Sequence, residues 1–158
     1  MKTRRADPMA ALRALSGNTR FTEEELTKLL IPGNTRFTEE ELTKLLIPPR
    51  LSIEAIRYGK CQPDDFDTVA VIVNATLVRC EQIPGDNTAA LDVCYDAMNA
   101  LREMQARAVR TTGKIGFGIG EMEAIVGAVD LHEQIAREST KKQMADALKE
   151  VLKRLGCG

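Results

Sequence analysis

A stretch of sixteen residues occurs twice in succession in this chain without a single change, at residues 17–32 and 33–48. Each copy reads Gly-Asn-Thr-Arg-Phe-Thr-Glu-Glu-Glu-Leu-Thr-Lys-Leu-Leu-Ile-Pro. Solenoid and propeller folds use longer units, in at least three copies that differ from one another, so this pair does not predict a repeat architecture. It indicates a recent or engineered duplication. We expect only one copy to occupy the native position, and the sequence does not reveal which.

Each copy carries signals for a helix start and a helix stop. In the second copy, Thr38 can cap the N-terminus while Glu41, three residues later, bonds back to the cap. Pro48 lacks a backbone donor and disfavours helix just before itself. The pattern therefore predicts a helix of about two to three turns at residues 39–47, with a matching one at 23–31 in the first copy.

Helical periodicity and turn residues predict helices along the rest of the chain, and no segment shows convincing strand alternation. The additional predicted helices lie at 9–15, 51–58, 63–80, 86–110, 121–138 and 141–155. The helix that begins at Pro63 has two apolar sides, so we expect it to be the central, most buried one. The chain is thus predicted to be all-α.

Length and composition are those of a globular protein, with 158 residues, 44% apolar and 28% charged. We expect a helix-turn-helix-like region at residues 1–83 and a three-helix region for dimerisation or partner binding at 86–158.

Residues 1–60 hold eleven Lys and Arg against eight acids, a mild positive excess in a chain of net charge −1. No apolar stretch is long enough to span a bilayer.

The segment from Phe37 to Pro63 has the layout of a helix-turn-helix: a capped helix, a turn of about four residues, a second short helix and a glycine stop. Ser52 would cap the second helix, and Pro48-Pro49 would form a stiff, extended link.

This segment resembles the helix-turn-helix of the phage repressor and Cro-like (xenobiotic-response-element) family over residues 37–63. The residues that match in one ungapped register are Thr38, Glu40, Glu41, Leu42, Leu45, Leu46, Arg50, Ile53, Ile56, Gly59, Lys60 and Pro63. The resemblance implies that Arg50 to Tyr58 is a recognition helix. The residues that would then face base edges or phosphates of double-stranded DNA are Arg50, Ser52, Glu54, Arg57 and Lys60.

We therefore expect a DNA-binding regulator, as a homodimer. The alternative is a non-enzymatic helical accessory protein that acts by binding another protein. The weak basicity of the chain motivates it, and so do two departures from the family. Glu39 stands where a phosphate-binding glutamine is usual, and Ile47 replaces the turn glycine and is followed by the stiff Pro48-Pro49 link.

No motif supports catalysis, so we predict that the chain is not an enzyme and has no catalytic, metal or cofactor residues. The glycine-rich loop at 112–120 is preceded by a helix instead of the strand that phosphate-binding loops need, which favours a simple connection with Phe117 in the core. His132-Glu133 lacks the second histidine of a zinc-protease motif and fits a partly buried histidine. The four cysteines have no zinc-ligand spacing, which favours a reduced, cytoplasmic compartment.

A fainter resemblance covers most of the chain. The series Arg-Phe-Thr, Pro-x-Arg-x-Ser, Asp-Phe-x-Thr-Val-Ala, Thr-Leu-Val-Arg-Cys-Glu, Thr-Gly-Lys-x-Gly-Phe and Ser-Thr-x-x-Gln-Met is similar to short uncharacterised proteins of proteobacterial phages, prophages and plasmids. It implies a mobile-element accessory protein and assigns no chemistry.

Overall fold

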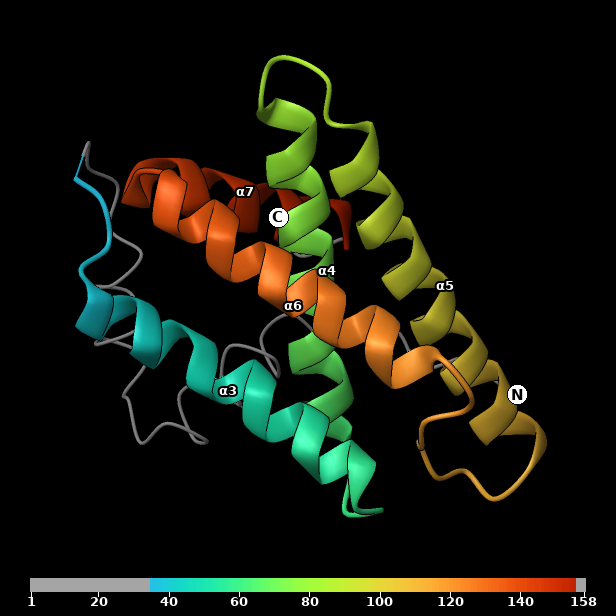
Figure 1. The fold of residues 1–158 in the computed structure, drawn as a ribbon. Helices are drawn as coiled ribbons and strands as arrows, with labels where there is room; N and C mark the ends of the chain where they lie inside the picture. Colours follow the sequence, from blue (N-terminus) through green and yellow to red (C-terminus); the bar gives the residue numbers. More distant parts are fainter. Residues whose placement is uncertain (1–34, 156–158) are drawn as a thin grey trace.

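The computed structural model describes residues 35–155, which form five α-helices and no strand (Figure 1). The helices are α3 (Glu39–Arg57), α4 (Pro63–Gln82), α5 (Thr88–Arg110), α6 (Glu121–Glu138) and α7 (Lys141–Arg154). The prediction of an all-α fold is confirmed. The helices predicted at 9–15 and 23–31, and with them the first duplicated copy, lie outside the described residues.

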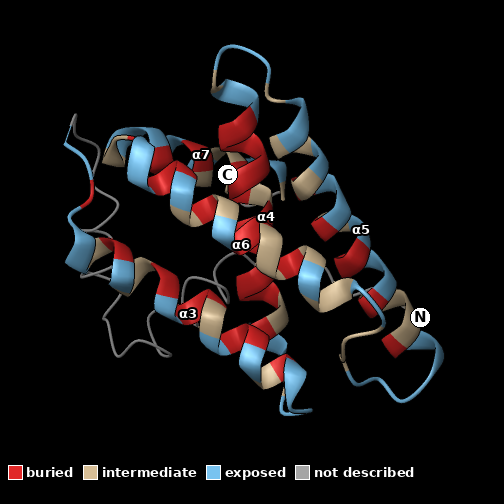
Figure 2. Ribbon diagram, viewed as in Figure 1, coloured by how far each residue is buried: buried red, intermediate tan, exposed pale blue. Residues whose placement is uncertain are grey.

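α4 is the central helix of the bundle. It contacts each of the four other described helices, and most of its residues are buried (Figure 2). Its fully buried residues include Thr68, Val69, Val73 and Thr76. The prediction that the helix starting at Pro63 is the most buried one is confirmed.

One hydrophobic core joins the first four described helices. It contains Ile53 of α3, Val73 of α4, Leu101 of α5 and Ile125 of α6. The boundary that we predicted between residues 83 and 86 therefore coincides with the turn from α4 to α5, and the core runs across it. In the described part of the chain, the two predicted regions pack as one body.

The predicted break at Pro48-Pro49 is wrong, because α3 is one continuous helix of 19 residues that contains both prolines. The separate helix predicted at 51–58, and the helix-turn-helix layout built on it, are therefore not present in this segment. A proline in a helix removes one backbone hydrogen bond, so α3 carries a local cost at this point.

Packing explains why α3 continues through the prolines. Five of its buried residues follow one another at intervals of four, three, four and three residues, which is the period of a single helix face: Leu42, Leu46, Pro49, Ile53 and Ile56. A break would turn the two halves out of phase and expose one of them. Burial of the whole face against α4 and α6 outweighs the lost hydrogen bonds.

The predicted helix ends are largely correct. Thr38 and Glu41 form a reciprocal capping box at the start of α3, and Thr140 and Gln143 form one at the start of α7. Gly59 takes the left-handed conformation after α3, with φ of 73°. These local signals work because they depend only on residues within one turn of the helix end.

The glycine-rich connection between α5 and α6 is held by one ion pair. The Arg107 guanidinium binds the Glu121 carboxylate at 2.5 and 3.2 Å and donates a 3.0 Å hydrogen bond to the carbonyl of Gly116. The same carboxylate accepts from the backbone N–H of Gly118. These hydrogen bonds, with Arg107 first, hold the pKa of Glu121 below its ordinary value. Glu121 thus occupies the backbone donor of Gly118, and Phe117 packs against the core as expected.

A Gly118→Ala substitution should loosen this connection. An added Cβ would lie 2.9 Å from Nη1 of Arg107 and 3.0 Å from Oε1 of Glu121, so the ion pair must shift. We expect a loss of about 1 kcal/mol and roughly fivefold faster tryptic cleavage after Lys114. Gly116→Ala is the matched control, because nothing lies within 4 Å of its added Cβ. Equal cleavage of the two variants would show that the Arg107–Glu121 ion pair does not hold this connection.

Candidate interaction surface on α3

The five residues predicted to face DNA do not share one exposed face. Arg50, Ser52, Glu54 and Arg57 lie on the C-terminal half of α3, and Lys60 follows it. Ser52 is fully buried, Arg50 is half-buried, and the other three are exposed. The structure thus brings Glu54, Arg57 and Lys60 to the surface near one another in the chain and separates the remaining two from them.

Ser52 is a structural residue. Its hydroxyl donates a 3.0 Å hydrogen bond to Oδ1 of Asp65, whose other oxygen accepts a 2.8 Å hydrogen bond from the backbone N–H of Gln62. This pair ties the middle of α3 to the first turn of α4. The predicted role of Ser52 as a helix cap is wrong, because the helix does not begin there, and a side chain with no exposed surface cannot reach a base or a phosphate.

Arg50 is directed toward α6. Its Nη2 lies 2.7 Å from Oδ1 of Asp130 and 3.7 Å from Oε1 of Glu133. Two carboxylates therefore share its charge, and a third charged group, Arg137, lies 3.7 Å from Glu133. Because these side chains are partly exposed, the network contributes little to stability, but it directs Arg50 away from the outer face of α3.

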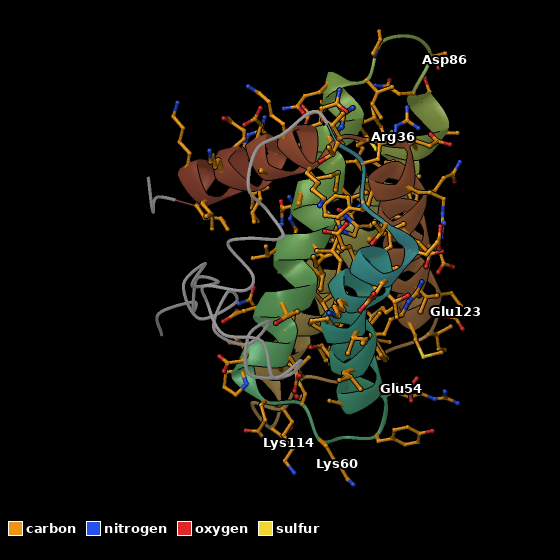
Figure 3. All side chains as sticks on the ribbon, turned by 90° about the vertical axis from the view of Figure 1, so that its left-hand side faces the viewer. Arg36, Glu54, Lys60, Asp86, Lys114 and Glu123 are labelled. Carbon is orange, nitrogen blue, oxygen red and sulfur yellow. The ribbon has the colours of Figure 1, made fainter. Side chains whose placement is uncertain are left out.

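The exposed end of α3 combines charge with an aromatic ring. Nη1 of Arg57 lies 3.7 Å from Oε1 of Glu54, and the guanidinium lies 5.3 Å from the centre of the Tyr58 ring. Figure 3 shows Glu54, Lys60 and Lys114 at the same end of the molecule. Both signs of charge are present there, so this end is not a purely cationic surface.

A row of exposed apolar side chains runs along the outer face of α3. We call it the α3 stripe: Ile47, Leu51 and Tyr58, which are 39%, 49% and 64% exposed. Together with Glu54 they are spaced by four, three and four residues, so they fall on one side of a continuous helix. Sequence reasoning missed the stripe because it placed a turn between Ile47 and Leu51. The spacing becomes meaningful only when the helix passes through the prolines.

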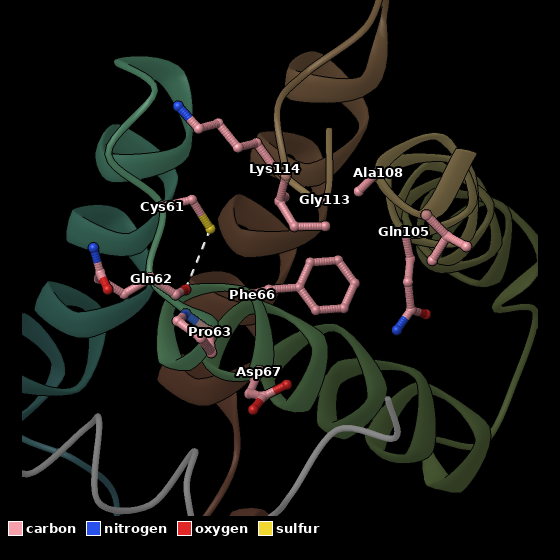
Figure 4. Close-up of a pocket in the computed structure, with 11 residues that line it drawn as sticks. Cys61, Gln62, Pro63, Phe66, Asp67, Gln105, Ala108, Gly113 and Lys114 are labelled. Atoms are coloured by element: carbon pink, nitrogen blue, oxygen red, sulfur yellow. Dashed lines mark hydrogen bonds between the residues drawn. The ribbon is translucent and has the colours of Figure 1, made fainter. Parts of the chain in front are cut away.

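A cavity of about 350 Å³ lies beneath the turn from α3 to α4 (Figure 4). Its lining is mainly apolar, with the Phe66 ring among it, and Cys61 and Lys114 contribute polar atoms. The Cys61 thiol donates to the carbonyl of Gln62, and burial, followed by the nearby charge of Asp65, raises the pKa of this thiol to about 11. Cys61 is therefore neutral at pH 7 and is a poor nucleophile.

The histidine and the two other cysteines of the described residues are buried. His132 is bonded to Thr76 inside the bundle, and Cys80 and Cys94 are buried between α4 and α5. Within residues 35–155, no three His, Cys, Asp or Glu side chains come together in a way that could hold a metal ion. None of the helices in this range is long and apolar enough to cross a membrane.

Comparison with protein-family models, with curated proteins and with solved structures gives no match to this chain.

Proposed function

We propose that this chain is a non-enzymatic helical protein that acts by binding another protein through the α3 stripe. The observation that carries the proposal is the exposure of Ile47, Leu51 and Tyr58 along one face of a helix whose opposite face is fixed in the core. Aromatic residues and arginine supply most of the binding energy in protein interfaces, and the stripe ends at Tyr58 with the Arg57 guanidinium beside its ring.

The charges around the stripe indicate what a partner should offer. Glu54 and Arg57 lie beside Tyr58, and Lys60 is exposed two residues further on. A partner with an apolar groove or an amphipathic helix, flanked by an acidic side chain near the Tyr58 end, fits this surface. A second copy of this chain is one such candidate, in keeping with the homodimer expected from the sequence.

Duplex DNA fits the same surface less well. A recognition helix places several polar side chains on one projecting face, whereas here Ser52 is buried and Arg50 is paired with two carboxylates. The remaining cations, Arg57 and Lys60, share the face with Glu54, which would repel phosphate. DNA binding therefore stays the competing prediction.

The test is capture of a partner from nuclease-treated lysate by the immobilised full chain, identified by mass spectrometry and then measured with the purified partner. Leu51→Arg should weaken binding about 10-fold or more, because it places a charge at the centre of the stripe. Ile119→Arg is the matched control, since Ile119 is fully exposed in the α5–α6 connection, away from α3. Equal effects of the two substitutions would contradict the proposal, and so would the absence of a captured partner for a chain that also stays monomeric in sedimentation.

Fluorescence anisotropy with random duplex DNA at low salt covers the competing prediction. Binding that weakens on both Arg57→Ala and Lys60→Ala, and falls steeply with added salt, would replace protein binding by DNA binding as the function.

A further inference from the structure

The N-terminal half of α3 and the four residues before it pack against an apolar surface formed by the other described helices. We call this surface the α3 seat. Its apolar residues come from α4, α5, α6 and α7, and they form one cluster with Phe37 and Leu42. The members contributed by these helices are Leu77, Cys80, Cys94, Ile135, Ala136 and Met144. Phe37 and Leu42 are 7% and 2% exposed, so they are the two anchors of the segment in the seat.

Polar contacts fix the register of this segment against the start of α7. The backbone N–H of Lys141 donates a 2.8 Å hydrogen bond to the carbonyl of Thr35, and Arg36 forms an antiparallel bridge with Thr140. The Lys141 ammonium binds Glu41 at 2.5 Å and lies 5.8 Å from the centre of the Phe37 ring.

The same contact set includes an ion pair with α6. Glu39 of α3 binds Arg137, while Lys141 lowers the pKa of Glu41 through their hydrogen bond. The ion pairs of Glu39 and Glu41 therefore hold the segment in the seat in addition to its two apolar anchors.

Every residue of the segment that contacts the seat has an identical counterpart sixteen positions earlier. The apolar anchors Phe37 and Leu42 correspond to Phe21 and Leu26. The capping and ion-pairing residues Thr38, Glu39 and Glu41 correspond to Thr22, Glu23 and Glu25. The chain thus contains two ligands of the same sequence for one seat. The seat cannot distinguish them by any side chain between residues 17 and 32.

The junction between the two halves of α3 is the point where the helix is weakest. Pro48 ends the duplicated unit, and neither Pro48 nor Pro49 has an N–H to bond to the preceding turn. The half before the prolines is therefore coupled to the half after them by fewer hydrogen bonds than elsewhere in α3. The C-terminal half keeps its own anchors, Ile53 and Ile56, and its Ser52 bond to Asp65.

We propose that the α3 seat also accepts residues 19–30 in place of 35–46, within the same molecule, so that the protein exchanges between two registers. In the exchanged register, residues 33–48 become a loop between Pro32 and Pro49. The described register is favoured because α3 is then continuous and no additional loop has to be closed. The exchange leaves the core of α4, α5 and α6 unchanged.

A double-substitution cycle in the full chain tests the exchange. Leu42→Asp places a charge at the centre of the seat and should shift the population to the first copy, whose Leu26 is intact. Its melting temperature should therefore fall clearly less than that of Leu42→Asp combined with Leu26→Asp, which leaves neither copy able to bind. We expect the double variant to melt about 10 °C or more below the unmodified protein. Leu26→Asp alone should change the melting temperature little.

Deletion of residues 17–32 provides the matched control. Without substitution, the deleted chain keeps residues 33–48 in the seat and should melt near the full chain. With Leu42→Asp it has no second copy and should melt as low as the double variant. Equal melting of Leu42→Asp with and without residues 17–32 would overturn the proposal.

Amide hydrogen exchange followed by mass spectrometry measures the change of register directly. In Leu42→Asp the two copies differ in mass, so their peptides can be distinguished, and protection should rise in 19–30 and fall in 35–46. The rescue of Leu42→Asp must not increase with protein concentration, because concentration-dependent rescue would mean that the first copy of one molecule occupies the seat of another, which overturns exchange within one chain. Neither experiment uses the partner of the proposed function, so the two proposals fail separately.

Discussion

Acidification from pH 7 to pH 4 is expected to lower the free energy of unfolding by about 3 kcal/mol through His132 alone. The imidazole is fully buried between α6 and α4, with Nδ1 2.9 Å from Oγ1 of Thr76. Burial, followed by the positive charge of Arg50, lowers the pKa of His132 from 6.5 to about 4.

The hydrogen bonds around His132 explain why its charged form is disfavoured. The Thr76 hydroxyl donates to the carbonyl of Ile72 at 2.8 Å, so its oxygen accepts from Nδ1–H of His132. The other ring nitrogen, Nε2, is buried and has no hydrogen-bond partner among the described residues. Protonation would place a charged N–H at Nε2 with nothing to accept it.

The direction follows from the two pKa values. As the pH falls below about 6.5, the unfolded chain takes up a proton on His132 while the folded protein does not, so stability is lost until the folded pKa of about 4 is reached. Glu41 and Glu121 have lowered pKa values in the fold, so their contribution is lost mainly at lower pH.

Urea denaturation at pH values from 4 to 7 measures this effect. In His132→Gln, which keeps a polar group next to Thr76 and cannot take up the proton, the pH dependence between 6.5 and 4.5 should be much flatter. An unchanged slope in that variant would assign the acid sensitivity to other groups.

Replacement of Ser52 by Asp is expected to destabilise the fold by roughly 3 kcal/mol or more, because it buries a second carboxylate against Asp65. Leu51→Asp is the matched control, since the adjacent side chain is 49% exposed and the change should stay within about 0.5 kcal/mol. Chemical denaturation of the two variants gives the comparison. If both changes were tolerated equally, Ser52 would face solvent, as a recognition helix requires.

The sequence predicted the helical elements well wherever the signal was local. The capping residues Thr38 and Thr140, the stop at Gly59 and the buried character of α4 all depend on neighbouring residues or on periodicity within one segment. The prediction failed at Pro48-Pro49. There the rule that proline ends a helix competed with the helical spacing of apolar residues on both sides of the prolines. Leu42 and Leu46 lie in helical phase with Ile53 and Ile56, and that phase would have indicated one helix.

The candidate site was harder to predict because its residues are defined by distant partners. Arg50 is turned to α6 by Asp130, eighty positions away, and Ser52 is bonded to Asp65 on the next helix. A sequence pattern predicts that these side chains lie on a helix, but it does not predict which side chain of another helix they contact. The α3 stripe, in contrast, could have been found from the spacing of Ile47, Leu51 and Tyr58, had α3 been recognised as continuous.

A backbone hydrogen bond joins Thr35, the first described residue, to Lys141 at the start of the last helix. Contacts between successive helices, such as α3 with α4 and α5 with α6, can form while the polypeptide is still being synthesised. The apolar cluster around Phe37 is completed only when Met144 has left the ribosome. Phe37 and Leu42 therefore reach their full burial only after more than a hundred further residues have been added.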